Sequence, residues 1–442
     1  MPKFELQILV RSPLHTAMML RYLQRSHLLL SLYWIFSGMC VYQTYRQYQD
    51  KQANIWVCLA RSSAALVILN SQIIMLSMMR VTISRFKYYR FSQWFLLDKH
   101  INIHQMAGHA FFISGIVHIL AYLGLAITKS YSLTSNLSGC VLCGLVAFFW
   151  LCANPYIRKS RYFELFYYSH YLFFPIQIIL CIHSAKYRQD LFLPTLGYFL
   201  DRGYRFYCIF YPSQIIDFKI WSSQVLELRV SRPQNFNYHS GDYTFVCIPA
   251  VSKTQWHPFS FSSDPNNPHY ITIHMRIAGN WTEQVQKLCQ DFLKSRETQK
   301  YSFQPLVYLD GPLSTPSSLV NTTQHVILVA QGIGATPYVS FLKYYLSQGL
   351  AMSGVRVDFF WLARDQGTFE WATPTFNAIA SKQMENVNIH LRTSKEINWL
   401  EELSSIEKKT KPTIFICGSE RLGQELAPVA SKLRFRLKQE NF

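Results

Sequence analysis

Four histidines lie inside apolar runs in the first half of this 442-residue chain, where an ionisable side chain is costly to bury. His104 and His118 share one run, and His170 and His183 share another. The first pair is 14 residues apart, which is close to four helical turns and about 21 Å of rise along one helix face. Two such helices, facing each other in a hydrocarbon core about 30 Å thick, would stack two bis-histidine sites of the kind that holds haem iron.

The second pair has a less regular spacing. Its 13 residues are about 3.6 turns, so an ideal helix would point His170 and His183 to different sides. Pro175 lies between them and can rewind or kink the helix. Hydrogen bonding across a helix bundle would explain a single intramembrane histidine, but two spaced pairs favour haem ligation. We expect His100 at the membrane interface and His109 in polar packing.

The second half of the chain carries a cluster of residues suited to a flavin. Aromatic and proline surface can pack the isoalloxazine ring, and a hydroxyl from Ser260 can hydrogen-bond near its N5. Arg276 and Thr282 can hold the pyrophosphate. The residues expected to contact FAD are His257, Pro258, Phe259, Ser260, Phe261, Ser262, Ser263, His274, Arg276, Gly279, Trp281 and Thr282.

A glycine loop follows an apolar strand at residues 325–330 and precedes an amphipathic run. Strand, glycine loop and helix together place a pyrophosphate on the amides of a helix N-terminus, because glycine lets the backbone approach closely. The loop residues expected at this dinucleotide are Gly332, Gly334, Ala335, Thr336 and Pro337.

Two later apolar runs, 358–364 and 413–418, predict further parallel strands of a doubly wound sheet. Arg364 ends the first of them and is the best candidate to bind a 2'-phosphate, which favours NADPH over NADH. Arg392 is a second candidate, and an ordinary surface arginine is the alternative for both. Cys417 and Gly418 would lie beside the nicotinamide, unless they are simply a small buried pair.

Long apolar runs before about residue 210 must position the histidines. Six spans are predicted at residues 26–44, 54–80, 102–128, 137–155, 162–184 and 191–211. With a cytoplasmic N-terminus, the inner segments hold 14 lysines and arginines against 5 in the outer ones. This asymmetry predicts an integral membrane protein whose N-terminus and second half are cytoplasmic.

The composition excludes several other classes. The net charge of +18 is spread between apolar runs without a continuous basic helix, so no nucleic-acid partner is expected. The ten cysteines show no CxxC or paired framework, which predicts free thiols and non-covalent haem. No cleavable signal peptide is expected. The short alternating strands between about 215 and 312 predict a small antiparallel β-barrel.

The sequence resembles the eukaryotic NADPH oxidases, within the wider ferric-reductase superfamily. The resemblance covers nearly the whole chain, and the family's landmarks occur in their usual order. They are YFELFYYSHYLFF around His170, HPFSFSS, IHMRIAGNWTE, GIGATP, FFWLARDQGTFEW, FICGS and the terminal KQENF.

This resemblance implies three domains. Residues 1–212 would form a six-span α-helical ferric-reductase-like haem domain. The rest would form a ferredoxin-reductase-like module, with an FAD-binding antiparallel β-barrel at 213–318 and an NADPH-binding doubly wound α/β domain at 319–442.

The resemblance also implies roles for individual residues. His104 and His170 would ligate an inner b-type haem, and His118 and His183 an outer one. Phe442, the terminal aromatic, would cover the flavin until nicotinamide displaces it.

Other catalytic residues follow from the same resemblance. Arg61 matches an intramembrane arginine at the oxygen site, with a snorkelling or salt-bridging arginine as the alternative. With Ser260, Cys417 and Phe442 it completes the residues expected to act directly in catalysis.

The chain also departs from the family. Tyr122 stands where many members have a histidine, and about seven residues separate His183 from Leu191, where relatives have a large external loop. The missing loop favours superoxide as the released product, with hydrogen peroxide forming downstream. No EF-hand occurs, so direct control by Ca²⁺ is not expected.

The expected reaction is hydride transfer from NADPH to FAD, followed by single-electron steps through two haems to O2 on the opposite face of a plasma or internal membrane. One alternative is a ferric- or cupric-chelate metalloreductase with the same electron path. Another is a membrane component without catalytic activity. The resemblance also implies a small transmembrane protein and cytosolic activators as partners, besides membrane lipid.

Overall fold

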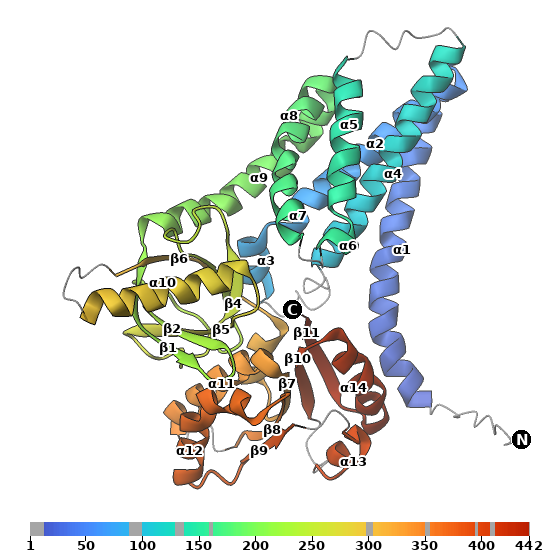
Figure 1. The fold of residues 1–442 in the computed structure, drawn as a ribbon. Helices are drawn as coiled ribbons and strands as arrows, with labels where there is room; N and C mark the ends of the chain where they lie inside the picture. The colour runs from blue at the N-terminus through green and yellow to red at the C-terminus, as the bar shows by residue number, and fades with distance from the viewer. Residues whose placement is uncertain are drawn as a thin grey trace, which may run out of the picture. The chain divides into compact units, whose positions relative to one another are not determined.

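The computed structural model describes residues 13–87, 100–128, 137–158, 162–297, 304–349, 354–393, 397–406 and 412–441. These residues divide into two compact units (Figure 1). The helical unit comprises Gln24–Ile83 and the described residues between 100 and 203. The sheet unit comprises the described residues from Tyr204 onward, together with 13–23 and 84–87.

Long apolar helices build the helical unit. The helical segments up to residue 210 are α1 (Pro13–Gln49), α2 (Ile55–Ser77), α3 (Arg80–Lys87), α4 (His100–Ile127), α5 (Leu137–Cys152), α6 (Pro155–Arg158), α7 (Phe163–Ser169), the 3-10 turn η4 (His170–Leu172), α8 (Phe173–His183) and α9 (Ala185–Phe210). Large apolar side chains such as Ile113, Leu120 and Ile178 are exposed on their outer surface. An apolar exterior of this kind suits lipid and is unfavourable in water.

Three of the predicted spans correspond to helices that are long and apolar enough to cross a membrane. Within the described residues these are Ile55–Ser77, His100–Ile127 and the combined run Phe163–His183. Helix α5 is apolar but shorter, and α1 and α9, which contain the first and last predicted spans, do not reach this standard. The protein is therefore a membrane protein, and the count of six spans stays a prediction.

A buried carboxylate of α9 holds the start of α3. Asp201 accepts hydrogen bonds from the backbone N–H of Thr82 at 2.7 Å and from its hydroxyl at 2.8 Å. Arg202 pairs with the same carboxylate at 2.9 Å. The first amides of a helix have no partner within the helix, so this carboxylate acts as a cap supplied from another helix.

The first sheet of the sheet unit is antiparallel and six-stranded, in the order β4-β3-β6-β1-β2-β5. Its strands are β1 (Ser213–Trp221), β2 (Val225–Ser231), β3 (Tyr243–Cys247), β4 (His257–Ser260), β5 (Tyr270–Arg276) and β6 (Leu306–Leu313), with helix α10 (Asn280–Glu297) after β5. An isolated bridge between Phe261 and Ile273 links the chain after β4 to β5. The antiparallel sheet is confirmed, and its closure into a barrel stays a prediction.

The second sheet is parallel throughout, in the order β11-β10-β7-β8-β9. Its strands are β7 (His325–Gln331), β8 (Arg356–Leu362), β9 (Val387–Arg392), β10 (Thr413–Gly418) and β11 (Arg436–Asn441). The accompanying helices are α11 (Thr336–Gln348), α12 (Thr373–Ser381), α13 (Trp399–Ser404) and α14 (Glu420–Leu433), with 3-10 segments η5 (Pro316–Thr322), η6 (Gly332–Ala335) and η8 (Gln366–Ala372).

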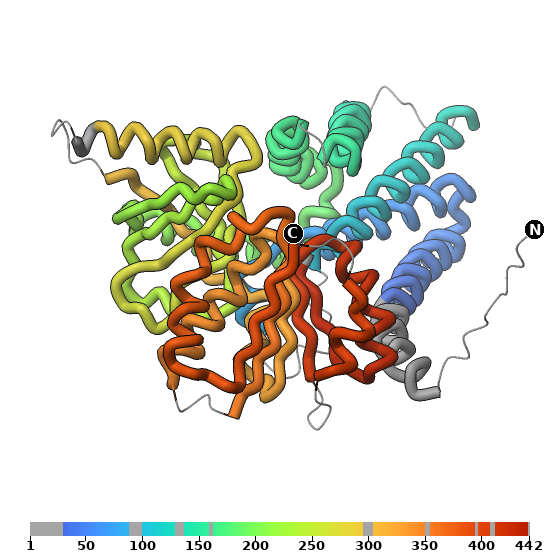
Figure 2. Tube along the Cα trace, turned by 60° about the horizontal axis from the view of Figure 1, so that its bottom comes forward, coloured from blue at the N-terminus to red at the C-terminus, as the bar shows by residue number. Residues whose placement is uncertain are grey.

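Helices cover both faces of this parallel sheet. Val326 and Leu328 of β7 pack in a core that includes α11 and α12, whereas Ile327 and Val329 pack in another that includes α13 and α14. Figure 2 shows the strands lying between the two sets of helices. Burial on both sides explains why β7 reads as a continuous apolar run, and the predicted parallel sheet is confirmed.

The polar face of β2 and β5 is buried as well as the apolar face. The apolar residues of the two strands form the core of the first sheet. Glu227, Thr272 and His274 point to the other side, yet their exposed fractions are only 6%, 3% and 3%. An alternating strand usually leaves its polar side chains in water, so another part of the chain must cover this face.

Replacing Asp201 with alanine should destabilise the helical unit. The substitution removes the cap of α3 and leaves buried amides without a partner, which costs about 1–3 kcal/mol. Thermal unfolding of the detergent-solubilised chain measures the loss. Asp190→Ala is the matched control on the same helix, because Asp190 forms an exposed pair with Lys186 at 2.9 Å, and such pairs contribute about 0.5 kcal/mol or less. Equal losses from the two variants would contradict the capping role.

Candidate functional site

The four intramembrane histidines meet in two facing pairs within the helical unit. The ring centres of His104 and His170 are 6.2 Å apart, and those of His118 and His183 are 6.5 Å apart. Two metal–nitrogen bonds of about 2 Å, extended by an imidazole ring at each end, span about 6 Å between ring centres. Each pair therefore has the separation that one iron atom between two imidazoles requires.

A change of helical winding makes up part of the rotation that the uneven spacing of the second pair leaves missing. Between His170 and His183 the chain is not a uniform α-helix, because η4 (His170–Leu172) interrupts it. A 3-10 turn advances about 120° per residue instead of about 100°, so three such residues add about 60° of rotation. Pro175 lies in the first turn of α8, where its missing N–H breaks no helical hydrogen bond.

Polar neighbours lie beside Nδ1 in three of the four rings. Three Nδ1 atoms have an oxygen nearby: His118 Nδ1 lies 2.9 Å from Ala60 O, His104 Nδ1 3.4 Å from Ile74 O, and His183 Nδ1 3.0 Å from Ser138 Oγ. An Nδ1–H that donates to such an oxygen leaves a lone pair on Nε2, which is the form that binds a metal. These observations fit haem at both pairs, with the porphyrin supplying the remaining ligands.

The surroundings of the two pairs differ. The ring of His170 packs against Phe149 and Phe166, with ring centres 4.8 and 5.1 Å away. The ring of Tyr122, which stands in place of a family histidine, lies 4.9 Å from the ring of His118. Arg61 is exposed on α2, next in sequence to the carbonyl that contacts His118, and its guanidinium lies 5.5 Å from the ring centre of Tyr48. Its place at an oxygen site stays a prediction.

An aromatic face lies at the β4 edge of the first sheet. The ring of Trp281 is 4.3 Å from the ring of His257 and 6.0 Å from that of Phe259. Burial lowers the pKa of His257 to about 4, so this ring is neutral at pH 7. The hydroxyl of Ser260 is buried and has no hydrogen-bond partner among the described residues. Such a hydroxyl is costly alone, and the polar edge of a flavin could satisfy it.

The start of α10 suits the pyrophosphate of the same cofactor. Thr282 accepts hydrogen bonds from the backbone N–H groups of Ala278 and Gly279 at 3.1 and 3.2 Å, which shapes the turn into the helix. Nothing fills the space beside Gly279, and Arg276 is exposed at the end of β5. A helix N-terminus with a neighbouring arginine favours a phosphate.

Four predicted flavin residues lie in the interior instead of on the aromatic face. Phe261 is fully buried, with its ring 4.3 Å from that of Tyr238. The hydroxyl of Ser263 is 2.8 Å from that of Tyr238, and the hydroxyl of Ser262 is 2.6 Å from Nδ1 of His274. Their surroundings indicate a structural contribution, and no contact with FAD is evident from their positions.

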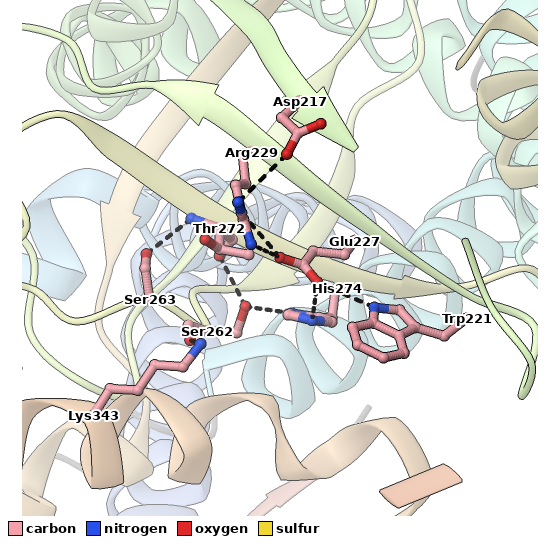
Figure 3. A network of polar contacts seen from close by, with 9 residues as sticks. All are labelled: Asp217, Trp221, Glu227, Arg229, Ser262, Ser263, Thr272, His274 and Lys343. Carbon is pink, nitrogen blue, oxygen red and sulfur yellow. Dashed lines mark hydrogen bonds and ion pairs between the residues drawn. The ribbon is translucent and has the colours of Figure 1, made fainter. Parts of the chain in front are cut away.

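His274 belongs to a buried polar network, drawn in Figure 3. Glu227 stands opposite it in the β2–β5 register, and His274 Nε2 lies 3.5 Å from Glu227 Oε2. Trp221 donates a hydrogen bond to Glu227 at 3.1 Å. Burial lowers the pKa of His274 to about 4. Burial raises the pKa of Glu227, but its contacts with His274 and Trp221 outweigh burial and bring the pKa down to about 2.

The same network joins the two sheets. Lys343 of α11 donates to the carbonyl oxygen of Ser262 at 2.8 Å, and Ser340, one turn earlier, donates to that of Ser263 at 2.7 Å. The ring of Trp371, from η8, lies 4.2 Å from the ring of His274. Helix α11 begins directly after the glycine loop, so these contacts place that loop relative to the first sheet.

The predicted glycine loop occupies η6, between β7 and α11. Gly332 has a φ of 56°, in the left-handed region, and its carbonyl accepts a hydrogen bond from Trp361 at 2.8 Å. A Cβ at Gly334 would collide with the carbonyl oxygen of Cys417. Ala335, Thr336 and Pro337 then start α11, whose first amides can receive a phosphate. The loop and Gly418 adjoin the carboxyl ends of β7 and β10, where the strand order reverses.

The two candidate arginines for a 2'-phosphate differ in their partners. Arg364 follows β8 and is exposed, with no hydrogen bond or ion pair to another described residue. Arg392 ends β9 and pairs with Glu402 at 3.0 Å. The unpaired guanidinium at the end of β8 is the better placed for an added phosphate.

Glu440 is a buried acid that the sequence predictions missed. It stands beside Cys417 in the β10–β11 register, and Ser317 donates to its carboxylate at 2.7 Å. Burial raises the pKa of Glu440 to about 7, against the opposing effect of Ser317. Burial and the charge of Glu440 hold the pKa of Cys417 well above its usual range, so the thiol stays protonated. A carboxyl that titrates near neutral pH can exchange a proton during turnover.

The sequence does carry signals for the positions that were missed. An acid in the terminal KQENF run marks Glu440. An acid in the strand that pairs with the strand of His274 marks Glu227 and the polar network. Phe442 lies outside the described residues, so its predicted place over the flavin is untested.

Three family models match successive parts of the chain. Residues 61–181 match the ferric reductase like transmembrane component, 210–317 an FAD-binding domain, and 323–398 the ferric reductase NAD binding domain. The fold and these matches define a class: a transmembrane ferric-reductase domain followed by a reductase module with FAD- and NAD-binding parts.

Similar curated proteins narrow the assignment. A superoxide-generating NADPH oxidase heavy chain of Dictyostelium discoideum is 24% identical, over 89% of this chain and 69% of its own. NADPH oxidase 5 of Homo sapiens is 23% identical, over 78% and 60%, and respiratory burst oxidase homolog protein D of Solanum tuberosum is 26% identical, over 80% and 50%. The chain thus spans between half and about two thirds of these relatives. Along most of its length the chain is similar to proteins described as NADPH oxidases.

A solved structure is more distantly similar to part of the chain. A ferredoxin-NADP+ reductase from Plasmodium falciparum with 2'P-AMP is 17% identical, with 52% of this chain and 95% of that chain covered and a TM-score of 0.41. A score this low supports no conclusion about the site.

Replacing Lys343 with methionine should slow flavin reduction by NADPH while leaving flavin content unchanged. The substitution removes the hydrogen bond to Ser262, a loss of about 1.5–3 kcal/mol for a charged donor. Stopped-flow flavin reduction, with flavin measured per chain, tests this. Lys382→Met is the control, since Lys382 is exposed and donates to Leu346 within the second sheet's own helices. Equal rates for both variants and the parent chain would contradict a role for the link between sheets.

Glu440→Gln should make stability less dependent on pH. The folded pKa of about 7 exceeds the usual value of 4.5, so the wild-type chain binds an extra proton in the folded state between these values. Wild-type stability should therefore fall as pH rises from about 4.5 to 7, by on the order of 3 kcal/mol at most. Thermal unfolding at pH 5 and pH 8 should show the glutamine variant relatively more stable at pH 8. Glu385→Gln, on the surface, should track the wild type.

Proposed function

We propose that this chain carries electrons from NADPH through FAD and two b-type haems across a membrane to O2, releasing superoxide. The observation that carries this proposal is the pair of histidine couples with ring centres 6.2 and 6.5 Å apart inside apolar helices. Hydrogen peroxide would form downstream. The relatives described as superoxide-generating NADPH oxidases support the choice of donor and acceptor.

In the membrane, His104 with His170 and His118 with His183 would hold the two haems at the two ends of the α4 repeat. Haem held by these pairs would supply one-electron transfer. Arg61, close to the His118 pair, would attract an anion that forms on that side. The protein would fix the distance between the paired histidines, the tautomer of each ligand and the charge around it.

In the sheet unit, each predicted group has a matching surface. The aromatic face with Ser260 would receive the flavin ring of FAD. We also propose that the antiparallel sheet closes into a β-barrel. The glycine loop and Arg364 would receive NADPH. FAD supplies the step from a two-electron donor to one-electron acceptors. Glu440 would exchange the accompanying proton, next to Cys417 at the strand end where the nicotinamide is expected.

The positive-inside rule supports a cytoplasmic N-terminus and a cytoplasmic sheet unit, with six spans in all. Two Dictyostelium relatives are described as heavy chains, which supports a search for a small membrane partner. Cytosolic activators belong to the same proposal.

A metalloreductase is the second candidate, because one observation favours it. Helix α8 ends at His183 and α9 starts at Ala185, so only Ser184 separates them. A site without a covering loop at this point would admit ferric or cupric chelates as acceptors.

Haem content and acceptor can be tested on one preparation. The purified chain should show two low-spin b-type haems in a reduced-minus-oxidised spectrum, and His118→Leu should lose one of them together with superoxide production. His109→Leu, on the same helix, should keep both haems. His109 is exposed, and within the described part of the chain it accepts a hydrogen bond only from Trp150, at 3.3 Å. A wild-type chain without haem would refute the proposal.

Superoxide-dismutase-sensitive reduction of cytochrome c, beside iron reduction detected with ferrozine, separates the two acceptors. Dominant iron reduction would favour the metalloreductase. Failure to oxidise NADPH with a soluble dye would indicate a membrane component without catalytic activity.

A further inference from the structure

Helix α2 contacts the outer ligand of α4 through two atoms one turn apart. Nδ1 of His118 lies 2.9 Å from the carbonyl oxygen of Ala60 and 3.4 Å from the hydroxyl of Ser63. Ser63 is 4% exposed, and its hydroxyl is within hydrogen-bond distance of the carbonyls of Leu59 and Ala60, at 2.8 and 3.0 Å. With its single proton donated within α2, the hydroxyl oxygen accepts from an imidazole Nδ1–H.

The same arrangement recurs at the inner ligand of α4. Nδ1 of His104 lies 3.4 Å from the carbonyl oxygen of Ile74 and 3.4 Å from the hydroxyl of Ser77. Ser77 is 7% exposed and donates to the carbonyl of Ile74 at 2.9 Å. A carbonyl and the serine three residues later therefore face each histidine.

The two arrangements are in register. Ser63 and Ser77 are 14 residues apart, as are His104 and His118. The helices run antiparallel, because the earlier serine meets the later histidine. Fourteen residues are close to four turns in both helices, so one face of α2 presents the same acceptor pair at two depths.

We propose that Ser63 and Ser77 are positioning residues that fix the tautomer and the electron donation of one haem ligand each. An Nδ1–H with a good acceptor makes Nε2 a stronger donor, which stabilises ferric over ferrous iron and lowers the midpoint potential. This inference rests on the proposed function, because it needs haem at both histidine pairs. In this proposal, α2 sets the midpoint potential of each haem separately.

The geometry also predicts unequal effects. His118 keeps a 2.9 Å contact with a backbone carbonyl when Ser63 is removed, whereas His104 keeps only one at 3.4 Å when Ser77 is removed. Losing Ser77 should therefore matter more. Neither backbone oxygen can be deleted by substitution, so the serines are the accessible part of each acceptor pair.

Spectroelectrochemical titration of the purified full-length chain tests this. Ser63→Ala and Ser77→Ala should each raise the midpoint potential of one haem and leave the other unchanged, with the larger shift for Ser77→Ala. Ser63→Thr and Ser77→Thr keep the hydroxyl and should restore the wild-type values. Combining each alanine variant with His118→Leu assigns the shift: only Ser77→Ala should move the haem that remains.

Ser71→Ala is the matched control. Ser71 is also buried on α2 and bonds the carbonyl of Val67 at 2.8 Å, but its other neighbour is the hydroxyl of Tyr187, at 3.0 Å. It should shift neither potential. Selective loss of one haem in a serine variant would support the proposal in stronger form. Two haems with unchanged potentials in both alanine variants would overturn it, whereas a wild-type chain without haem would overturn the proposed function instead.

Discussion

An imidazole among apolar helices needs a partner on each of its two ring nitrogens, and the helical unit is arranged around this constraint. Neither water nor a charged surface is at hand in lipid, so an unsatisfied ring nitrogen would cost several kcal/mol. Carbonyl and hydroxyl oxygens take up Nδ1 of His104, His118 and His183. The pair separations of 6.2 and 6.5 Å between ring centres leave room for one iron atom.

The sheet unit solves a comparable problem with a different device. Glu227 and His274 are polar, paired across two strands and buried, because α11 and η8 cover their face of the first sheet. Lys343 adds a cation whose pKa burial lowers to about 8. Each group is acceptable in the interior only beside its partners. Lys343 and Ser340 of α11 also donate to carbonyls of the chain after β4, so these contacts hold α11 against the first sheet.

His274 lies in a motif whose residues face different parts of the fold. The HPFSFSS and IHMRIAGNWTE runs do come together in the fold, with Trp281 against His257. Within the same runs, Phe261, Ser262 and His274 lie in the interior. Spacing by two residues separates the faces of a strand, but sequence alone does not say which face the cofactor takes.

The histidine positions, the glycine loop and the strand pattern follow from the sequence, because helical rise, glycine's freedom and alternation are local properties of the chain. Tertiary structure decided the rest. The 3-10 turn at His170 supplies part of the rotation that a uniform helix would lack between the two histidines. Glu440 became notable only when β11 paired with β10 and buried it beside Cys417. Ser63 and Ser77 gained meaning only when α2 packed in register with α4, since a hydroxyl's partner across a helix contact depends on packing that no local pattern encodes.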